Sequence, residues 1–387
     1  MKNIELKSKI INDKYTEYVY ETFDIQNRQE TIVNIPINLK DINNFDWNIG
    51  IILGSSGSGK TTILKQLGKL KQPKFDLEIP LISNFDWLEP KDATLVLTSM
   101  GLSSVPTWLR PFNTLSNGEK YRAALAYLVA SAKDGEIILV DEYTSVVDRD
   151  VAKSMSFALQ KYIRRVNKKI ILASCHFDIL QWLMPDWTCL PQKGGALERC
   201  DYRRQGRPKI NLQVSRVTSK TWELFKKHHY LTSNVNESYI FLLFEWNNNP
   251  IAIGVIGRQI GRGVGKAYRG SRIVVLPDYQ GINIGTSISN FMAAICKNEK
   301  ARYFTKTINP ALGEWRNKNE NMWKQTAFNG KTRIKTNEKE NKYKNLRLKK
   351  SYCHEFIGHS LKGYEHLLLP IEKMRYKQEH QNQITLF

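Results

Sequence analysis

A stretch of nine residues near the N-terminus has the residue types and spacing of a phosphate-binding loop. It reads Gly54-Ser55-Ser56-Gly57-Ser58-Gly59-Lys60-Thr61-Thr62. This is the G-x-x-x-x-G-K-[ST] pattern, and it lies between a short apolar run, 51–53, and a segment, 63–67, with helical spacing. Glycines let several backbone N–H groups turn toward one phosphate, and the helix start adds its positive dipole end. The stretch predicts an ATP site in which Lys60 reaches the β- and γ-phosphates and the Thr61 hydroxyl binds Mg²⁺.

Two further apolar runs end in polar residues that suit the same chemistry. The run 136–140 is followed by Asp141 and Glu142, and the run 170–174 is followed by Cys175 and His176. A buried strand that ends in carboxylates is what P-loop enzymes use to hold Mg²⁺ and polarise water. We therefore expect Asp141 to bind the metal and Glu142 to activate the attacking water.

Five motifs, in this order along the chain, resemble those of the ATP-binding-cassette (ABC) ATPases. They are the loop 54–62, Leu115-Ser116-Asn117-Gly118-Glu119, Asp141-Glu142, Ser145-Val146-Val147-Asp148 and His176. The resemblance implies an ATP-dependent homodimer, in which Ser116 and Gly118 contact the γ-phosphate bound by the second copy. It also implies that Asp148 lies at the dimer seam and that His176 contacts the γ-phosphate. The sequence departs from the family at Asn117, where most members have Gly, and at Glu119, where many have Gln.

A second glycine motif lies in the C-terminal half. A predicted hairpin over 239–256 and a strand over 272–277 precede it, and an amphipathic helix over about 286–297 follows. This order resembles the GNAT acyltransferases, in which loop amides and a helix start hold the coenzyme A pyrophosphate. The resemblance implies an α+β domain with a mixed sheet that binds acetyl-CoA or another acyl-CoA. The implied binding residues are Leu276, Gln280, Gly281, Asn283, Ile284 and Gly285. Asn283 replaces the usual inner Gly, and Asn also tolerates left-handed backbone.

In the C-terminal half, the sequence indicates the catalytic residues less clearly than the implied coenzyme A-binding residues. Many GNAT enzymes place a Glu base on the strand before the loop, but 272–276 contains no carboxylate. His228, His229 and Tyr230 lie in a helix predicted over 221–231, and His229 and Tyr230 are our candidates for catalysis. The alternative is that both residues only support the fold.

Residues of roughly 215–360 also resemble a small set of phage and mobile-element proteins related to the Mom-type DNA base modifiers. The shared features are His228-His229-Tyr230-Leu231, 275–281, Asn309-Pro310-Ala311-Leu312, Trp323 and a predicted last strand over 351–358. This resemblance favours a nucleic-acid substrate.

The charge of the chain is unevenly distributed. The formal net charge is +21 over 387 residues; 25 Lys and Arg face 23 Asp and Glu in 1–200, whereas 33 face 14 in 201–387. The segment 331–350 alone contains nine basic residues. This asymmetry predicts that the C-terminal half binds a polyanion, DNA or RNA. A solvated basic surface is the alternative.

We predict an α/β protein of two domains. An ABC-type ATPase domain would span 1–200, a basic linker 201–214, a GNAT-like domain 215–365 with the basic segment 331–350, and a polar tail 366–387, frayed from Met374 to Phe387. Residues 1–46 are expected to form an antiparallel lead-in to the P-loop strand, with strands at 18–20 and 31–35. No window approaches the roughly 18 apolar residues of a membrane span. The first residues lack a secretory signal, and the five widely spaced cysteines do not suggest a disulfide framework. We therefore expect a cytoplasmic protein without a membrane partner.

The preferred hypothesis is an ATP-driven dimer that controls acyl transfer to DNA or RNA by the C-terminal half. One alternative is an acetyltransferase that acts on a protein or a small amine. Another is a non-catalytic clamp, an ABC dimer whose GNAT-like fold only binds nucleic acid. Coenzyme A binding separates the clamp from the two transferases.

Overall fold

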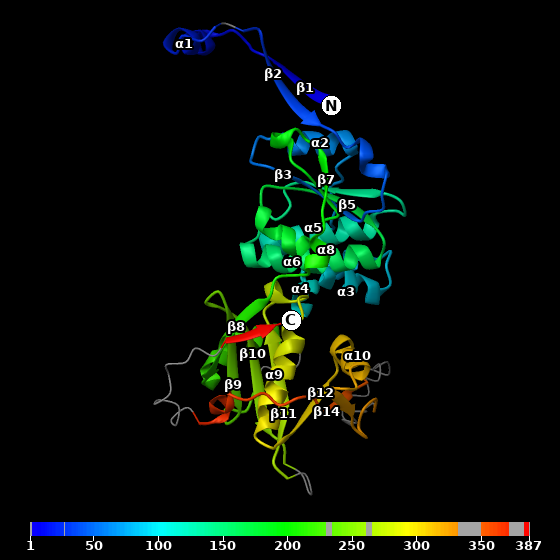
Figure 1. Ribbon diagram of the computed structural model, residues 1–387, viewed down its shortest axis with the longest axis vertical. Helices are drawn as coiled ribbons and strands as arrows, with labels where there is room; N and C mark the ends of the chain where they lie inside the picture. The colour runs from blue at the N-terminus through cyan, green and yellow to red at the C-terminus, as the bar shows by residue number, and fades with distance from the viewer. Residues whose placement is uncertain are drawn as a thin grey trace. The chain divides into compact units, whose positions relative to one another are not determined.

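A computed structural model describes residues 2–26, 28–229, 234–260, 265–331, 350–370 and 383–386. The chain divides into two compact units (Figure 1). Unit 1 comprises Met1–Ser103 and Thr107–Pro208, and unit 2 comprises Ser104–Pro106 and Lys209–Phe387. Both units combine helices with a β-sheet, so the protein is of mixed α/β class.

Unit 1 is built on a five-stranded sheet in the order β4-β5-β3-β6-β7. The strands are β3 (Ile49–Leu53), β4 (Ile137–Val140), β5 (Lys169–Ser174), β6 (Trp187–Cys189) and β7 (Leu197–Arg199). All neighbours are parallel except the edge strand β7, which is antiparallel to β6. In β3, Ile51 packs into one hydrophobic core and Ile52 into the other. Because both faces are covered, these strands are continuous apolar runs, and the strands predicted at 51–53, 136–140 and 170–174 are confirmed.

Helices pack on both faces of this sheet. They are α2 (Lys60–Leu67), α3 (Pro90–Ser99), α5 (Asn117–Ser131), α6 (Arg149–Arg165) and α7 (Leu180–Leu183). Two further short helices are α4 (Val105–Trp108), whose first two residues belong to unit 2, and α8 (Tyr202–Gln205), which has no buried residue. Residues of α3, α5 and α6, including Val96, Val129 and Leu159, fill one core. Ile63 and Leu64 of α2 belong to the other core. The helices predicted at 63–67 and 121–132 are confirmed: α2 follows the glycine-rich loop 54–62, and α5 runs from Ser116 toward β4.

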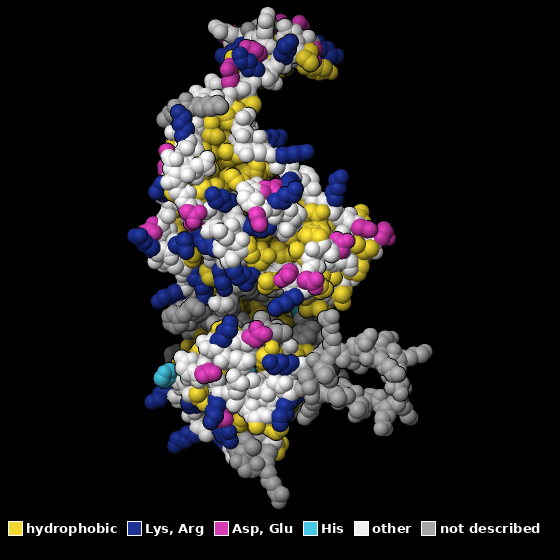
Figure 2. Space-filling view, turned by 90° about the vertical axis from the view of Figure 1, so that its right-hand side faces the viewer, with side chains coloured by type: hydrophobic (Ala, Val, Ile, Leu, Met, Phe, Trp, Pro, Cys, Tyr) yellow, Lys and Arg dark blue, Asp and Glu magenta, His cyan; other side chains and the backbone are white. Residues whose placement is uncertain are grey.

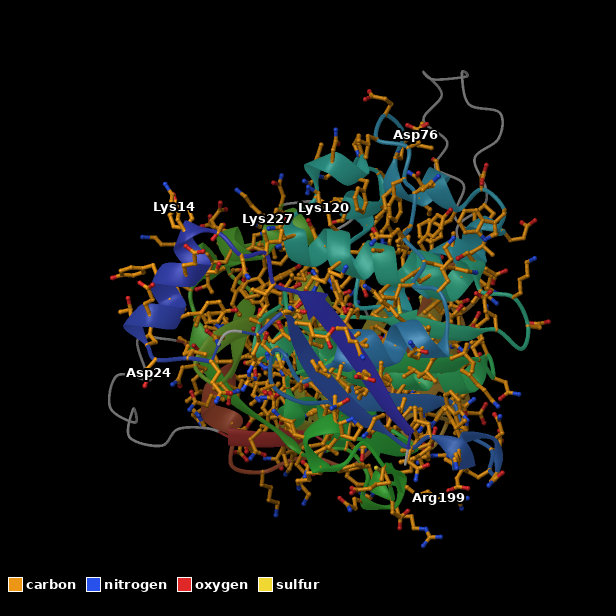
Figure 3. All side chains as sticks on the ribbon, turned by 90° about the horizontal axis from the view of Figure 1, so that it is seen from above. Lys14, Asp24, Asp76, Lys120, Arg199 and Lys227 are labelled. Atoms are coloured by element: carbon orange, nitrogen blue, oxygen red, sulfur yellow. The ribbon has the colours of Figure 1, made fainter. Side chains whose placement is uncertain are left out.

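The first residues agree with the prediction in part, because the strand predicted at 31–35 is confirmed and pairs in an antiparallel sheet. β1 (Lys2–Lys9) and β2 (Glu30–Ile37) pair with each other in a separate antiparallel sheet, so they do not extend the sheet of the P-loop strand. The strand predicted at 18–20 is wrong, because these residues lie in α1 (Lys14–Thr22). The Asp13 side chain begins this helix by accepting hydrogen bonds from the backbone N–H groups of Tyr15 and Thr16. No residue of α1 is buried, and hydrophobic side chains are visible on this part of the molecule in Figure 2. Figure 3 labels Lys14 at the start of the helix and Asp24 just beyond its end.

Unit 2 is built on an eight-stranded sheet in the order β13-β14-β12-β11-β10-β9-β8-β15. The strands are β8 (Ile210–Val217), β9 (Ile240–Trp246), β10 (Asn249–Arg258), β11 (Ala267–Val275), β12 (Arg302–Thr307), β13 (Trp323–Gln325), β14 (Tyr352–Phe356) and β15 (Gln383–Leu386). Only β11 and β12 are parallel, and α9 (Ile284–Asn298) connects them. Asn247 and Asn248 have φ values of 51° and 63° in the β9–β10 turn, a conformation that matches the strand twist. The predicted hairpin and the helix at 286–297 are confirmed.

Different elements cover the two faces of this sheet. On one face, α9 packs so closely on β10 that a Cβ at Gly254 would lie 2.5 Å from the sulfur of Met292. On the other face, Trp222 and Phe225 join a core with Phe241. The α-helix predicted over 221–231 is wrong for its described part, which forms 3₁₀ turns at Ser219–Leu224 and Lys226–His228. Side chains three residues apart share one side of a 3₁₀ turn, so Trp222 and Phe225 both reach the core.

The C-terminal residues also depart from the prediction. The tail predicted to be frayed ends in β15, which pairs antiparallel with β8. α10 (Pro310–Lys318) lies between β12 and β13 along the chain. Within the described part of the chain, none of the helices combines the length and the apolar composition needed to cross a membrane.

Candidate functional site

The predicted phosphate-binding loop connects β3 to α2 in unit 1. Gly57 and Gly59 have φ values of 77° and 88°, in the left-handed region that a side chain disfavours. A Cβ at Gly59 would also lie 2.6 Å from Cδ1 of Ile35 on β2. The loop therefore needs glycine at Gly59 for two reasons, its backbone conformation and its close packing. From Gly59 the chain enters α2 at Lys60, which places the start of a helix beside the loop.

Two side chains of the loop, those of Lys60 and Ser55, form hydrogen bonds within the protein. The Lys60 Nζ donates hydrogen bonds to the carbonyl oxygens of Gly54 and Ser55, at 2.8 and 2.7 Å. From the segment between β6 and β7, Gln192 donates through Nε2 to the Ser55 hydroxyl at 2.6 Å. The Ser58 hydroxyl is buried and has no hydrogen-bond partner in the described structure. Lys60 therefore contacts only neutral acceptors here, which an arriving phosphate can replace by a charge-assisted hydrogen bond.

The two carboxylates follow β4 in a strained turn. Glu142 and Thr144 both have left-handed backbone, with φ values of 49° and 71°. Between them, the Tyr143 N–H donates to the Ala173 carbonyl at 2.7 Å and the Tyr143 carbonyl accepts from the Ser174 hydroxyl at 2.8 Å. Residues in such conformations persist only where their surroundings hold them, and they cluster at functional sites. The turn leaves the Glu142 side chain exposed and Asp141 half-buried.

His176 lies directly after β5 and contacts this turn. Its Nδ1 is 3.0 Å from the hydroxyl of Thr144. Burial lowers the pKa of His176, and the positive charge of Arg149 lowers it further, so the ring is neutral at pH 7. Since β4, β5 and β3 are parallel neighbours, their carboxyl ends meet at one edge of the sheet. The structure thus places the loop, Asp141-Glu142 and His176 along a single edge.

Ser116 and Gly118 lie at the start of α5. Ser116 caps the helix by accepting from the Glu119 N–H, while the Glu119 carboxylate accepts from the Ser116 N–H. Burial raises the pKa of Glu119, but hydrogen bonds from Ser116 and Thr107 outweigh it and leave that pKa below its usual value. The Glu119 that replaces the common Gln therefore closes the capping box as a carboxylate. Ser116 itself remains exposed, so a ligand can reach its hydroxyl from outside.

Asp148 has a local structural role. Its carboxylate caps α6 by accepting hydrogen bonds from the N–H groups of Asp150 and Val151. The next residue, Arg149, forms an ion pair with Asp178 beyond His176. A Cβ at Gly118 would lie 3.5 Å from Val147, so the start of α5 adjoins the segment that leads to Asp148. An exposed Asp148 side chain in this position can still meet a second copy of the chain.

The residues present fit a nucleotide with Mg²⁺. Among the described residues, no group of three His, Cys, Asp or Glu side chains could hold a metal ion by itself. A nucleotide-bound Mg²⁺ does not need such a group, because phosphate oxygens and water supply most of its ligands. The exposed hydroxyl of Thr61 and the carboxylate of Asp141 are the protein ligands that this arrangement offers.

The second glycine motif forms a tight loop between β11 and α9 in unit 2. Gly281 and Asn283 have φ values of 85° and 68°, so Asn283 adopts the left-handed conformation expected of it. The side chain of Gln280 donates to the Val275 carbonyl at 2.7 Å, and the Leu276 N–H donates to the Ile251 carbonyl at 2.8 Å. Ile284 is buried in α9, whereas Gly285 has room for a Cβ at 3.5 Å from Val275.

The strands beside this loop separate from each other. β11 pairs with β12 only over Ala267–Gly270, although β11 continues to Val275 along β10. The end of β11 therefore has no paired strand on its β12 side within the described structure. This opening and the loop at the start of α9 are next to each other, because Val275 leads directly into the loop.

The candidate catalytic residues of unit 2 are only partly described. His229 follows the second 3₁₀ turn, and its ring packs edge-on against Trp222, with 5.7 Å between ring centroids. Tyr230 lies outside the described residues. No observation here gives His229 a base function, and β11 brings no carboxylate to the loop.

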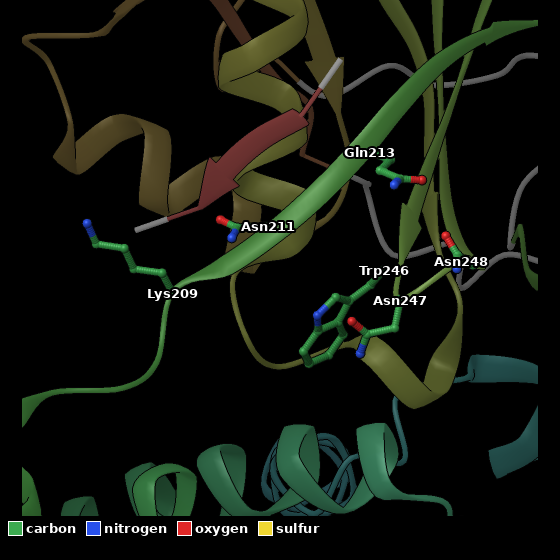
Figure 4. A pocket seen from close by; sticks show the side chains of 6 residues that line it. All are labelled: Lys209, Asn211, Gln213, Trp246, Asn247 and Asn248. Atoms are coloured by element: carbon green, nitrogen blue, oxygen red, sulfur yellow. The ribbon is translucent and has the colours of Figure 1, made fainter. Parts of the chain in front are cut away.

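Unit 2 also contains a polar recess that the motifs did not predict. It has a volume of about 440 Å³, and Figure 4 shows the residues that line it. They are Lys209, Asn211, Gln213, Trp246, Asn247 and Asn248. Amide side chains gathered from β8 and the β9–β10 turn give no nucleophile and no carboxylate, so the recess can bind polar groups but does not resemble a catalytic site. A run of Asn at 247–249 was its only signal in the sequence.

Comparisons with known proteins bear on unit 1 only. No protein-family model matches the sequence, and the comparison with curated proteins finds no match. Similar solved structures include a dimeric ATP-binding cassette in a post-hydrolysis state bound to ADP and Pi, at 17% identity and a TM-score of 0.33. The similarity covers 45% of this chain and 94% of that one. A dimeric bacterial ABC transporter cassette is 16% identical over 44% of this chain and 89% of its own, with a TM-score of 0.32. The likeness falls on the N-terminal half, and the mixed sheet of the C-terminal half has no assigned fold.

Proposed function

We propose that the protein is an ATP hydrolase of the ABC type whose ATP-driven dimerisation controls acyl transfer to nucleic acid. The observation that carries the ATPase proposal is the edge of the unit 1 sheet. There, a left-handed glycine loop with Lys60, the turn Asp141-Glu142 and the strand-end His176 follow three neighbouring parallel strands.

Each residue of this edge has a role in the proposed hydrolysis. The loop amides and Lys60 hold the phosphates, and Thr61 and Asp141 would hold Mg²⁺, which neutralises phosphate charge when bound. The exposed Glu142 carboxylate accepts a proton from a water molecule, whose oxygen attacks the γ-phosphorus, and ADP departs with inorganic phosphate as the other product. His176, neutral at pH 7, donates a hydrogen bond to the γ-phosphate. Ser116 and Gly118 of a second copy close the site.

The test of the ATPase proposal is Glu142→Gln in the full chain. The amide cannot take the proton, but it leaves the phosphate cradle intact, so hydrolysis should fall by at least about 100-fold while ATP accumulates in a dimer. Size exclusion with and without ATP, alongside phosphate release, measures both effects. Glu136→Gln is the matched control at the start of the same strand, where Glu136 pairs with Lys71. A Glu142→Gln protein that binds ATP and remains monomeric would count against ATP-driven dimerisation.

The acyl-transfer part rests on the loop of unit 2 and on the opening between β11 and β12. Left-handed backbone at Gly281 and Asn283 directs the chain into α9, whose start can hold a pyrophosphate. Beyond Gly270, β11 has no described strand partner on its β12 side, so its backbone groups there can pair with the amide portion of coenzyme A. The basic C-terminal half supports nucleic acid as acceptor, more than a protein or a small amine.

Calorimetry with acetyl-CoA on the full chain tests this part. Gly281→Val should abolish the heat of binding, because a β-branched side chain is strained at a φ of 85° and obstructs the loop. Gly135→Val, at a φ of 78° with no neighbouring atoms within 4 Å in unit 1, is the matched control for backbone strain. If the unmutated protein shows no heat with acetyl-CoA, the transferase proposal fails and the clamp takes its place.

A further inference from the structure

Unit 2 contains a cluster of buried polar side chains between its sheet and the helix α10. It comprises Tyr303 and Thr305 of β12, Arg316 of α10 and His354 of β14, with exposed fractions of 1%, 6%, 2% and 0%. Each side chain has at least one buried polar atom without a hydrogen-bond partner in the described structure: Tyr303 Oη, Thr305 Oγ1, Arg316 Nε and Nη1, and His354 Nδ1. Buried polar atoms are nearly always satisfied in proteins, so five unsatisfied atoms in one cluster need an explanation.

The register of the strands brings these side chains together. Tyr303 and Thr305 are two residues apart and share one face of β12, and Thr305 is directly opposite His354 in β14. Gly270 of β11 leaves room for the phenol, because a Cβ there would lie 2.5 Å from the Tyr303 oxygen. Electrostatic interactions join Arg316 to both Tyr303 and His354.

The contacts of Arg316 with other described residues are with neutral groups. Its Nη2 donates to the Ser289 hydroxyl of α9 at 2.7 Å, and its guanidinium carbon is 4.6 Å from the centre of the Trp323 ring. None of the ion pairs among the described residues includes Arg316. An interior guanidinium without a carboxylate partner is costly, since a buried charge is normally paired.

The protonation states leave the cluster with one positive charge. Burial lowers the pKa of Arg316 to about 10, which keeps it charged at pH 7. Burial, together with the charge of Arg316, lowers the pKa of His354 to about 4, so this ring is neutral. Burial also raises the pKa of Tyr303 far above neutrality. Since His354 Nε2 and Asn329 Nδ2 both contact Asn317 Oδ1, Nε2 carries the proton of His354 and Nδ1 is an acceptor.

We propose that Arg316, Tyr303, Thr305 and His354 form a binding site for a small oxyanion, presented by a carboxylate or a phosphate group. Arg316 neutralises the anion, and the Tyr303 and Thr305 hydroxyls donate hydrogen bonds to its oxygens. His354 Nδ1 accepts from a hydroxyl of the ligand or from one of the two protein hydroxyls. The site is independent of the proposed acyl-CoA loop, because none of its residues belongs to 276–285.

Hydrogen exchange of the full-length protein, read peptide by peptide, tests this site. Sodium chloride is replaced at constant ionic strength by sodium acetate in one arm and by sodium phosphate in the other. At a tenfold excess over its Kd, the bound ion should lower the population of the open state, and with it the exchange rate of 302–307 and 352–356, about tenfold. Protection by phosphate alone identifies a phosphate ligand, and protection by acetate alone identifies a carboxylate. Phosphate binding at the ATP loop appears separately, in peptides of 54–62.

Two variants make the test specific. Arg316→Met should abolish the protection, and it should not lower the melting temperature in chloride, because it removes a buried charge that has no partner. Arg302→Met is the matched control, since Arg302 lies on β12 beside Tyr303 but is exposed and pairs with Glu355. If Arg316→Met does not fold, Tyr303→Phe tests the proposal instead. This variant removes one hydroxyl donor to the anion, so it should weaken the protection from exchange severalfold. The proposal is overturned if neither ion protects these strands, or if the protection persists in the variant.

Discussion

The hydroxyl of Thr144 lies 3.0 Å from Nδ1 of His176, and this hydrogen bond joins the turn after β4 to the end of β5. Thr144 makes the contact from left-handed backbone, at a φ of 71°. If the hydroxyl donates to Nδ1, the proton of the neutral ring is on Nε2, which is then a donor for a phosphate oxygen. With the hydroxyl as donor, the strained turn has a chemical consequence, because it sets the tautomer of His176.

Removing this hydrogen bond should slow ATP hydrolysis and leave ATP binding intact. Thr144→Val keeps the β-branched shape and the backbone strain but loses the hydroxyl, and we expect hydrolysis to fall by roughly tenfold, about the worth of one hydrogen bond. Thr144→Ser keeps the hydroxyl and should stay within about twofold of the unmutated rate. Phosphate release at saturating ATP measures both variants. Equal losses in the Val and Ser variants would show that the rate of hydrolysis does not depend on this hydrogen bond.

The stability of unit 2 should depend on pH through His354. Its pKa is about 4 in the folded protein and 6.5 in the unfolded chain, because burial and the charge of Arg316 oppose protonation. Below pH 6.5 the unfolded chain therefore binds a proton that the folded protein does not. Stability that is fully present above pH 6.5 is lost as the pH falls toward 4, by at most about 1.4 kcal/mol per pH unit.

The variant His354→Gln removes this titration and should flatten the pH dependence. Hydrogen exchange of the amides of 352–356 in chloride buffer, followed from pH 7 to pH 4 and corrected for intrinsic rates, gives the free energy of opening. The difference between the unmutated protein and the variant should change between pH 6.5 and pH 4 and be constant above pH 6.5. Parallel curves throughout this range would contradict the lowered pKa.

The sequence predicted those parts of the fold that depend on local patterns. The buried strands of unit 1 are continuous apolar runs, and Asn247-Asn248 specify the turn of a hairpin, so both were recognisable. The helix at 14–22 was missed although Asp13 and Thr16 form a capping box, because three aromatic or β-branched residues at 18–20 suggested a strand. The prediction of an α-helix over 221–231 was wrong because the spacing of apolar residues alone cannot distinguish an α-helix from two 3₁₀ turns.

The candidate site was predictable only where its residues belong to motifs. Lys60, Glu142 and His176 are in such motifs, and the order of the strands explains how they reach one edge. Gln192 contacts Ser55 from 137 residues away, and no local pattern points to it. Arg316 is equally hidden, because a lone Arg on a polar helix reads as a surface residue until the packing of α10 against α9 buries it.

The last prediction concerns nucleic acid and the basic C-terminal half. Lys and Arg side chains are spread over the face drawn in Figure 2, with acidic side chains among them. The densest basic run, 331–350, falls mainly outside the described residues, so its contribution has to be measured. If six of its basic side chains contact phosphates, the logarithm of the affinity for duplex DNA should fall with the logarithm of salt concentration, with a slope of about −5.

Replacing Lys342, Lys344, Lys349 and Lys350 together by Gln should flatten that slope by about one unit per lost contact. Any sequence preference should change little, because phosphate contacts position a protein and do not specify bases. The matched control replaces four exposed lysines of unit 1, Lys40, Lys74, Lys91 and Lys133, by Gln. Fluorescence anisotropy with labelled duplex at several salt concentrations measures all three proteins. If affinity does not depend on salt, or if both quadruple variants lose the same slope, the basic run is a solvated surface and the acceptor has to be sought among proteins or small amines.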